Sequence, residues 1–180
     1  MKSFSDKCKD LFFKAEKLAK VSNNLYIYPE HLALNIFSNP SYIINKILDN
    51  FNLNNQSVIP VIEKNISKLP IIKSEIKEIK IHYDTNKILN KAISLANDNG
   101  DDVVAEDYLL LAFISEKNSL TDFFKSKKIN KEKLKIVIDQ LRKGKKAMTN
   151  TAENNFDSLN RYAVDITQKA SQGLIDPVIG

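Results

Sequence analysis

The sequence has few of the residues that form cross-links, metal sites or tight turns. Its 180 residues include one Cys, two His, four Gly and five Pro. With Cys8 alone, an internal disulfide framework and a multi-thiolate metal site are excluded, and His31 and His82 add too little for zinc. So little Gly and Pro does not suit the many turns of a β-sandwich. We therefore expect an all-α fold.

A long apolar run and a secretory leader are also missing. The longest apolar run, residues 108–114, is far shorter than the roughly 20 residues that cross a bilayer. Charged residues stand among the first six positions, so no apolar leader segment begins there. We expect no membrane partner and a reducing compartment, the cytoplasm of a bacterial-type cell, with an organelle as the alternative.

What the chain does have is an ordinary globular composition, 43% hydrophobic and 27% charged, with a net charge of +5. Residues 125–146 contain ten Lys or Arg against Glu132 and Asp139, a local charge of +8, so the rest of the chain sums to −3. This basic segment predicts a solvated helix face and a linker. A small nucleic-acid-binding protein is the remote alternative, because the interleaved aromatics that stack on single strands are missing there. We expect no nucleic-acid partner.

The chain contains an internal repeat. Residues 14–19 (KAEKLA) recur as residues 91–96 (KAISLA), an offset of 77, and residues 28–34 (YPEHLAL) recur as residues 104–110 (VAEDYLL), an offset of 76. The offset of 76 continues at Leu53 with Ile129, Val58 with Leu134 and Ile62 with Ile138. Two pseudo-symmetric copies of one unit explain this pattern, with the loop before the second helix one residue shorter in the second copy.

Apolar spacing predicts four helices in each copy. In the first copy, one face carries Cys8 and Leu11, a second helix begins at Pro29, a third begins at Pro40, and a fourth carries Val58 and Ile62. A further helix with Phe156 follows. We expect a domain over 1–144 (repeat one about 1–69, repeat two about 84–144), a flexible linker over 145–155, and the truncated start of another module over 156–180. We expect residues 69–83 to form an ordered linker, and the sequence leaves open whether it is a short strand, a helix or a loop.

Catalytic motifs are missing. The Gly144-Lys145 pair lacks the Ser or Thr and the first Gly of a phosphate-binding loop. Cys8 lies on an apolar helix face and predicts a buried structural thiol, while His31 at a helix start predicts a packing or capping role. We therefore expect this chain not to be an enzyme, and to hold no cofactor or metal.

Acidic residues gather at the starts of the two second helices. Glu30 and Glu106 occupy matching positions in the repeat, and Asp101 and Asp107 lie beside the second of them. Helix capping and compensation of the helix dipole explain such carboxylates without any ligand. Acceptance of the backbone amides or basic groups of a bound peptide is the other interpretation.

The repeats and the tail together resemble the N-terminal region of the ClpB-type disaggregases, in the Clp family of hexameric AAA+ unfoldases. The segments that carry the resemblance are PEHL at 29–32, GDDVV at 100–104, LRKGKK at 141–146, LNRYAVDIT at 159–167 and GLIDPVIG at 173–180. The resemblance covers essentially the whole chain and is most specific in the tail. In this family such a tail leads into the first ATPase module.

The resemblance implies a monomeric Clp repeat domain that captures unfolded or aggregated polypeptides and hands them to the rest of the hexameric ATPase. The substrate-contacting positions of the family correspond to Ser5, Asp101 and Asp107; the last of these can be the longer Glu in the family. ATP and Mg²⁺ would act in the full-length parent, outside this chain. An adaptor or co-chaperone is a further implied partner.

A ClpC-type receptor is the alternative that the resemblance leaves open. In those relatives, the paired repeat glutamates that correspond to Glu30 and Glu106 recognise phosphorylated arginine and adaptor surfaces. Both glutamates are present here, although the tail is more similar to ClpB than to ClpC.

Overall fold

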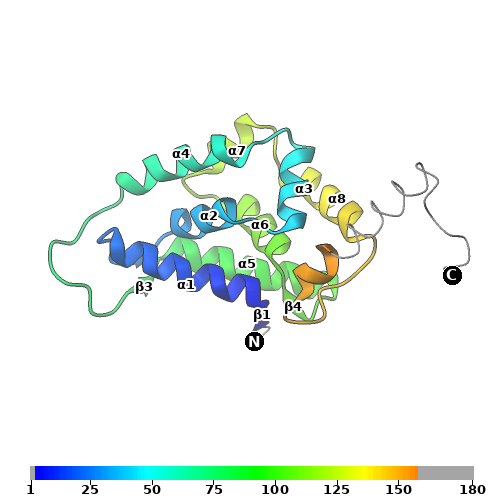
Figure 1. The fold of residues 1–180 in the computed structure, drawn as a ribbon, viewed down its shortest axis with the longest axis horizontal. Helices are drawn as coiled ribbons and strands as arrows, with labels where there is room; N and C mark the ends of the chain where they lie inside the picture. The colour runs from blue at the N-terminus through cyan, green and yellow to red at the C-terminus, as the bar shows by residue number, and fades with distance from the viewer. Residues whose placement is uncertain (1–2, 158–180) are drawn as a thin grey trace, which may run out of the picture.

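The computed structural model describes residues 3–157, which form two groups of four helices (Figure 1). The first repeat contains α1 (Asp6–Val21), α2 (Pro29–Ser38), α3 (Tyr42–Asn50) and α4 (Asn55–Ser67). The second contains α5 (Tyr83–Asn99), α6 (Glu106–Ser115), α7 (Thr121–Ser126) and α8 (Lys131–Arg142). A further helical turn runs from residue 152 to the last described residue, 157. The all-α prediction with two four-helix repeats is confirmed.

Side-chain caps fix where several helices begin. The side chains of Ser5, Ser41, Asn54 and Asn130 accept hydrogen bonds from backbone amides in the first turns of α1, α3, α4 and α8. The cap at Ser41 moves the start of α3 two residues beyond the predicted Pro40. Gly100 ends α5 in the left-handed conformation, at φ 77°, which favours glycine. None of the described helices is long and apolar enough to cross a membrane.

Four two-residue strands join the repeats reciprocally. Strand β1 (Ser3–Phe4) pairs in parallel with β4 (Val103–Val104), and β2 (Tyr26–Ile27) pairs in parallel with β3 (Lys80–Ile81). Adding 77 to the numbers of β1 and β2 gives β3 and β4. The strand that leads into each repeat therefore pairs with the inner strand of the other repeat, and the two repeats interlock. The linker predicted over 69–83 is an irregular segment that ends in β3 and the start of α5.

The structure corrects one detail of the repeat. Strands β2 and β4, and the first residues of α2 and α6, are related by 77 and not by 76. Glu30 is therefore equivalent to Asp107, and Glu106 is equivalent to Pro29, so the predicted pairing of Glu30 with Glu106 is wrong. The offset becomes 76 only by α4 and α8, whose caps are Asn54 and Asn130. The apolar run can be matched at either offset, and only strand pairing and capping decide between them.

The two repeats share one hydrophobic core. Every residue of α6 from Glu106 to Phe113 is buried, and α2 is buried over most of its length. The ring of Phe124 lies 6.0 Å from that of Phe37 and 6.3 Å from that of Phe113, so aromatic contacts cross from one repeat to the other. Because the core is continuous, we expect the two repeats to unfold together.

This shared core generates a stability prediction. Ile62 on α4 and Ile138 on α8 are equivalent positions, and both are fully buried. We expect Ile62→Ala and Ile138→Ala each to lower the free energy of unfolding by about 2–5 kcal/mol, through lost burial and the cavity left behind. Ile136→Ala, at an exposed position of α8, is the control. Denaturant unfolding measures all three; two separate transitions in either variant would contradict a single core.

Candidate functional site

A buried ion cluster lies where α6, α8 and the turn before β4 meet. The guanidinium of Arg142 contacts Asp107 through Nε, 2.7 Å from Oδ2, and through Nη2, 2.8 Å from Oδ1. Its Nη1 lies 3.0 and 2.9 Å from the two carboxylate oxygens of Asp101. All three side chains are at least 98% buried. Arg142 therefore pairs with both Asp101 and Asp107, the two carboxylates that the family resemblance places at a substrate site.

Aromatic rings cover both sides of this cluster. The guanidinium carbon of Arg142 lies 4.5 Å from the ring centre of Tyr108 and 4.6 Å from that of Phe156. Burial alone would lower the pKa of the guanidinium, but the two aspartates raise it above its ordinary value. Arg142 is thus a permanent buried cation matched by two carboxylates.

Ser5, the third predicted substrate contact, directly follows β1, the strand that pairs with β4. Its hydroxyl caps α1 and donates a hydrogen bond to Glu153 Oε2 at 2.6 Å. The same oxygen accepts the backbone N–H of Glu106 at 2.9 Å. The carboxylate of Glu153 therefore lies at the N-termini of α1 and α6, where both helix dipoles favour a negative charge.

Glu106 itself is a buried carboxyl without a hydrogen-bond partner. Its side chain is fully buried, and neither carboxyl oxygen makes a hydrogen bond. Burial raises its pKa to about 8, and neighbouring Glu153 adds to the rise, while the Lys7 ammonium opposes it. Burial also raises the pKa of Glu153. Glu106 is therefore mostly protonated at neutral pH.

The equivalent place in the first repeat has no arginine and one carboxyl, Glu30, where the second repeat has two. Asn24 stands at the position of Asp101, and His31 stands at that of Tyr108. His31 Nδ1 accepts the Tyr28 N–H at 2.9 Å, and its Nε2 lies 3.0 Å from Asn24 Oδ1. Burial lowers the pKa of this imidazole to about 4, so it is neutral. The capping role predicted for His31 is confirmed.

The structure brings some of the predicted site residues together and separates others. Ser5, Asp101, Asp107 and Glu106 gather around the start of α6, and all four are fully buried. Glu30, at the start of α2, is 4% exposed, and burial raises its pKa, with Ser119 and His82 among its neighbours. Glu30 and Glu106 therefore do not form one paired surface.

Residues 145–155 differ from the free linker that the sequence predicts. The docked segment, as we name residues 147–157, packs beside β1 and β4 (Figure 1). Ala147, Ala152, Glu153 and Phe156 are buried by this contact. The part of the prediction that concerns residues 158–180 lies outside the described residues.

Sequence reasoning missed Arg142, Glu153 and Phe156. A signal for the first was present: Arg142 follows Leu134 and Ile138 at spacings of four, which places it on the buried face of α8. No local pattern could reveal the contacts of Glu153 and Phe156. The partner of Glu153, Ser5, lies 148 residues away in the sequence, and Phe156 contacts Arg142 on a separate helix.

A second surface feature is the axial groove, about 100 Å³, which lies between α1, α5 and the β2–β3 pair. Phe12 and Leu89, which the offset of 77 relates to each other, line it from opposite repeats. The groove therefore lies at the junction of the two repeats, beside the β2–β3 pair. Its full lining is Phe12, Ile27, Leu32, Ile81, Thr85 and Leu89.

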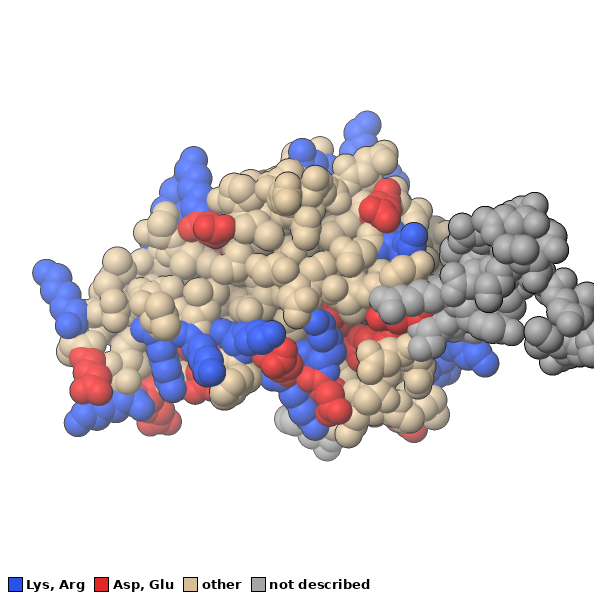
Figure 2. Space-filling view, viewed as in Figure 1, with Lys and Arg blue, Asp and Glu red and all other residues tan. Residues whose placement is uncertain are grey.

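Among the described residues, the ion cluster and the axial groove are not accompanied by a metal-binding group or an activated cysteine. Within residues 3–157, no group of three or more His, Cys, Asp or Glu is placed to hold a metal ion. Cys8 is fully buried, and its burial raises the pKa of the thiol, which makes it a poor nucleophile. Lys and Arg alternate with Asp and Glu along the lower edge of the view in Figure 2, in place of a single-sign surface.

The ion cluster generates a stability prediction. Arg142→Met keeps the volume of the side chain but leaves two buried carboxylates unpaired, which costs about 3–5 kcal/mol of folding free energy. Combining it with Asp101→Asn and Asp107→Asn should recover part of this loss. Lys145→Met, at an exposed position, is the control. Denaturant unfolding provides the measurement, and a loss under about 1 kcal/mol for Arg142→Met would reject the pairing.

The buried Glu106 predicts a pH dependence. Its folded pKa of about 8 exceeds the ordinary 4.5, so between these values the native state keeps a proton that the unfolded state releases. Stability from this group is therefore present below pH 4.5 and is lost as pH rises, by about a factor of ten in the unfolding constant per pH unit. Glu106→Gln should flatten the profile between pH 5 and 8 in thermal unfolding, and the exposed Glu132→Gln should leave it unchanged. An identical slope for both variants would contradict a buried neutral Glu106.

Comparison with known proteins identifies the family of the chain. Residues 3–127 match the model of the Clp repeat N-terminal domain. The chain is 32% identical over 179 residues to the chaperone protein ClpB of Rickettsia prowazekii, covering 98% of this chain and 21% of that protein. It is 28% identical over 178 residues to the ClpB of Bacteroides thetaiotaomicron, covering 99% and 20%. The chain thus spans about a fifth of the length of these relatives.

Solved structures agree on the fold. The Hsp104 N-terminal domain from Candida albicans superposes with a TM-score of 0.73 at 22% identity, covering 84% of this chain and 99% of that one. The N-domain of ClpV from Vibrio cholerae superposes with a TM-score of 0.64 at 17% identity, covering 77% and 84%. With a family model matched over most of its length, and with similarity to ClpB chaperones along all of it, the chain belongs to the Clp repeat N-terminal domain family.

Proposed function

We propose that this domain captures unfolded or aggregated polypeptides and hands them to a hexameric, ATP-driven motor. The axial groove is the observation that carries the proposal. Its lining is almost entirely apolar, and Ile81 at its edge is 46% exposed. Membership of the Clp repeat family and the similarity to ClpB along the whole chain support it. ATP and Mg²⁺ then act in modules outside this chain, and the domain itself performs no catalysis.

The physical properties of the groove suit a receptor for many sequences. Apolar area gives attraction without direction, so any exposed apolar side chain of an unfolded client gains free energy there. A groove of about 100 Å³ holds only one or two such side chains, which keeps the affinity weak. Weak binding suits a domain that must release each client to the motor.

A second groove is available for the same purpose. Leu95 and Leu111 form an apolar depression of about 250 Å³ between α5, α6 and α8, rimmed by Lys91, Lys131 and Lys135. Lysine ammonium groups at the rim donate hydrogen bonds to the carbonyl oxygens or carboxylates that accompany apolar client segments. The axial groove remains the stronger candidate because residues of both repeats form it.

The ClpC-type alternative gains no support from the geometry. Recognition of phosphoarginine requires an accessible pair of carboxylates, and Glu30 and Glu106 are separate and buried. Glu106 also carries a pKa of about 8, which leaves little negative charge to attract a guanidinium at neutral pH.

The proposal predicts that a charge in the axial groove weakens client binding. We expect Ile81→Asp to raise the dissociation constant for reduced, carboxymethylated α-lactalbumin at least fivefold, since the carboxylate must be desolvated against apolar side chains. Amide chemical-shift titration measures the affinity. Ile136→Asp, at an exposed apolar position on α8, is the matched control. Equal affinity for the two variants would remove the axial groove as the client site.

The same titration separates the alternatives. Apolar capture should change little between 50 and 300 mM salt, whereas binding of single-stranded nucleic acid would weaken steeply with salt. Saturable shifts with free phosphoarginine and none with the unfolded polypeptide would replace the proposal by the ClpC-type receptor.

A further inference from the structure

The docked segment contacts the domain first through its main chain. The carbonyl oxygen of Ala147 accepts the backbone N–H groups of Asp102 at 2.8 Å and Val103 at 3.1 Å, and its own N–H donates to Asp101 Oδ1 at 3.0 Å. The carbonyl of Asn150 accepts the Asp6 N–H at 2.8 Å. Main-chain bonds of this kind do not depend on the side chains of the segment, apart from the small size needed at residue 147.

The helical turn that follows contacts the domain through its side chains, among them Asp157, whose Oδ2 accepts the Tyr42 N–H at 3.4 Å. Glu153 binds the Ser5 hydroxyl and the Glu106 N–H, and Phe156, three residues later, stacks on Arg142. A spacing of three places both side chains on one face of a helix. The other face is in solvent, since Asn154 and Asn155 are exposed. A glutamate and an aromatic residue three positions apart thus anchor the segment.

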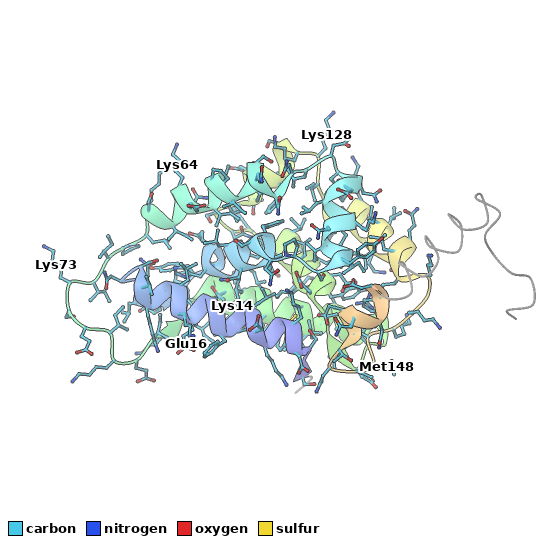
Figure 3. All side chains as sticks on the ribbon, viewed as in Figure 1. Lys14, Glu16, Lys64, Lys73, Lys128 and Met148 are labelled. Carbon is cyan, nitrogen blue, oxygen red and sulfur yellow. The ribbon has the colours of Figure 1, made fainter. Side chains whose placement is uncertain are left out.

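A short exposed connection joins the docked segment to α8. Residues 143–146, which connect it to α8, are all exposed, and Met148 at the edge of the domain is 53% exposed (Figure 3). In the first repeat, the equivalent segment also bonds to its own turn, but through a side-chain donor: the carbonyl of Pro70 accepts Asn24 Nδ2 at 3.0 Å. That segment, however, continues into β3 and α5 and is held at both ends.

The chemistry beneath the segment favours exchange over permanent packing. The docked Glu153 brings a second carboxyl beside the buried Glu106, and Glu153 Oε1 is itself buried without a hydrogen-bond partner. A buried polar group without a partner costs free energy, so part of the favourable contact is offset while the segment is docked.

We propose that the surface around Ser5, Val103 and Arg142 is a binding site for a polypeptide segment with a small extended residue followed by a helical turn carrying Glu-x-x-Phe, and that residues 147–157 are its resident occupant. This inference rests on the proposed function, in that client segments of the same chemistry displace the resident one. Asp107 and Asp101 hold Arg142 in place, Asp101 also accepts the backbone N–H of the incoming small residue, and the Ser5 hydroxyl donates to the incoming carboxylate.

Tethering sets how strongly a client must bind. A short linker gives the resident segment an effective concentration on the order of millimolar. If the segment is docked in about nine of ten molecules, the apparent affinity for a competing client is lowered about tenfold. Release would also free the docked residues, which span at most about 35 Å when extended and lengthen the tether to the following module.

Binding in trans tests this site directly. The probe is a fluorescent synthetic peptide with the sequence of residues 146–157, and the receptor is the full 180-residue chain carrying Glu153→Ala and Phe156→Ala. We expect this chain to bind the peptide at least tenfold more tightly than the unaltered chain, because its own segment no longer competes. A chain with Met148→Ala and Asn154→Ala, exposed positions of the same segment, is the matched control and should behave like the unaltered chain. Equal binding by all three chains overturns the proposal.

A second measurement uses the unaltered chain and does not depend on the stability of a variant. The same peptide with an N-terminal nitroxide, in excess, should broaden the amide signals of Asp102, Val103 and Glu106, since it exchanges with the resident segment. A nitroxide peptide in which the Glu and Phe are replaced by Ala should not. Failure of the first peptide to broaden these signals overturns the proposal.

A client arm separates this inference from the proposed function. If reduced, carboxymethylated α-lactalbumin binds the double variant more tightly than the unaltered chain and the peptide competes with it, both stand. If the peptide binds as expected but the client binds neither chain, client capture is rejected while the segment-binding site is retained. If the client binds both chains equally and the peptide does not compete, client capture stands and exchange at this site is rejected.

Discussion

The buried guanidinium of Arg142 is the interaction on which the second repeat depends. It ends α8, holds the turn before β4 through Asp101 and the start of α6 through Asp107, and carries Phe156 on its outer side. A buried cation of this kind contributes little net stability when paired, but its loss leaves two carboxylates uncompensated in the interior. The Arg142 cluster therefore specifies how α8, the start of α6 and the turn before β4 are arranged. Its guanidinium is also the surface on which Phe156 of the docked segment packs.

The pseudo-symmetry of the two repeats is broken at this point. The backbone plan is shared, including the reciprocal strand pairs and the crossing of each outgoing segment over its own turn. The side chains are not shared, because Ile66 stands on α4 where Arg142 stands on α8, and Asn24 stands where the second repeat has Asp101. The first repeat thus joins His31 to Asn24 by a hydrogen bond and has no arginine at this place, whereas the second repeat pairs one arginine with two aspartates. This difference explains why only the second repeat has a charged surface on which an acidic and aromatic segment docks.

The two candidate surfaces differ in what they recognise. The axial groove offers apolar area alone and discriminates little between clients. The surface under the docked segment offers backbone bonds, two helix N-termini and an arginine face, which together select a carboxylate and an aromatic ring. A domain that carries both has one site with broad specificity and one with narrow specificity, and the narrow site is the one that its own chain fills.

The sequence by itself determined the helical class, the two repeats of four helices, the start of α2 at Pro29 and the structural roles of Cys8 and His31, since these follow from periodicity, helix-start residues and composition. It also gathered Ser5, Asp101 and Asp107 as one set through family resemblance. It could not determine the register of the second helices, because an apolar run matches itself at either offset and only the pairing of β2 with β3 and β1 with β4 decides. Nor could it show that Arg142 neutralises both aspartates or that Glu153 caps α6 and binds the Ser5 hydroxyl, because these partners lie 35 to 148 residues apart in the sequence. Contacts over such separations are selected by the packing of whole helices, and only the tertiary structure decided them.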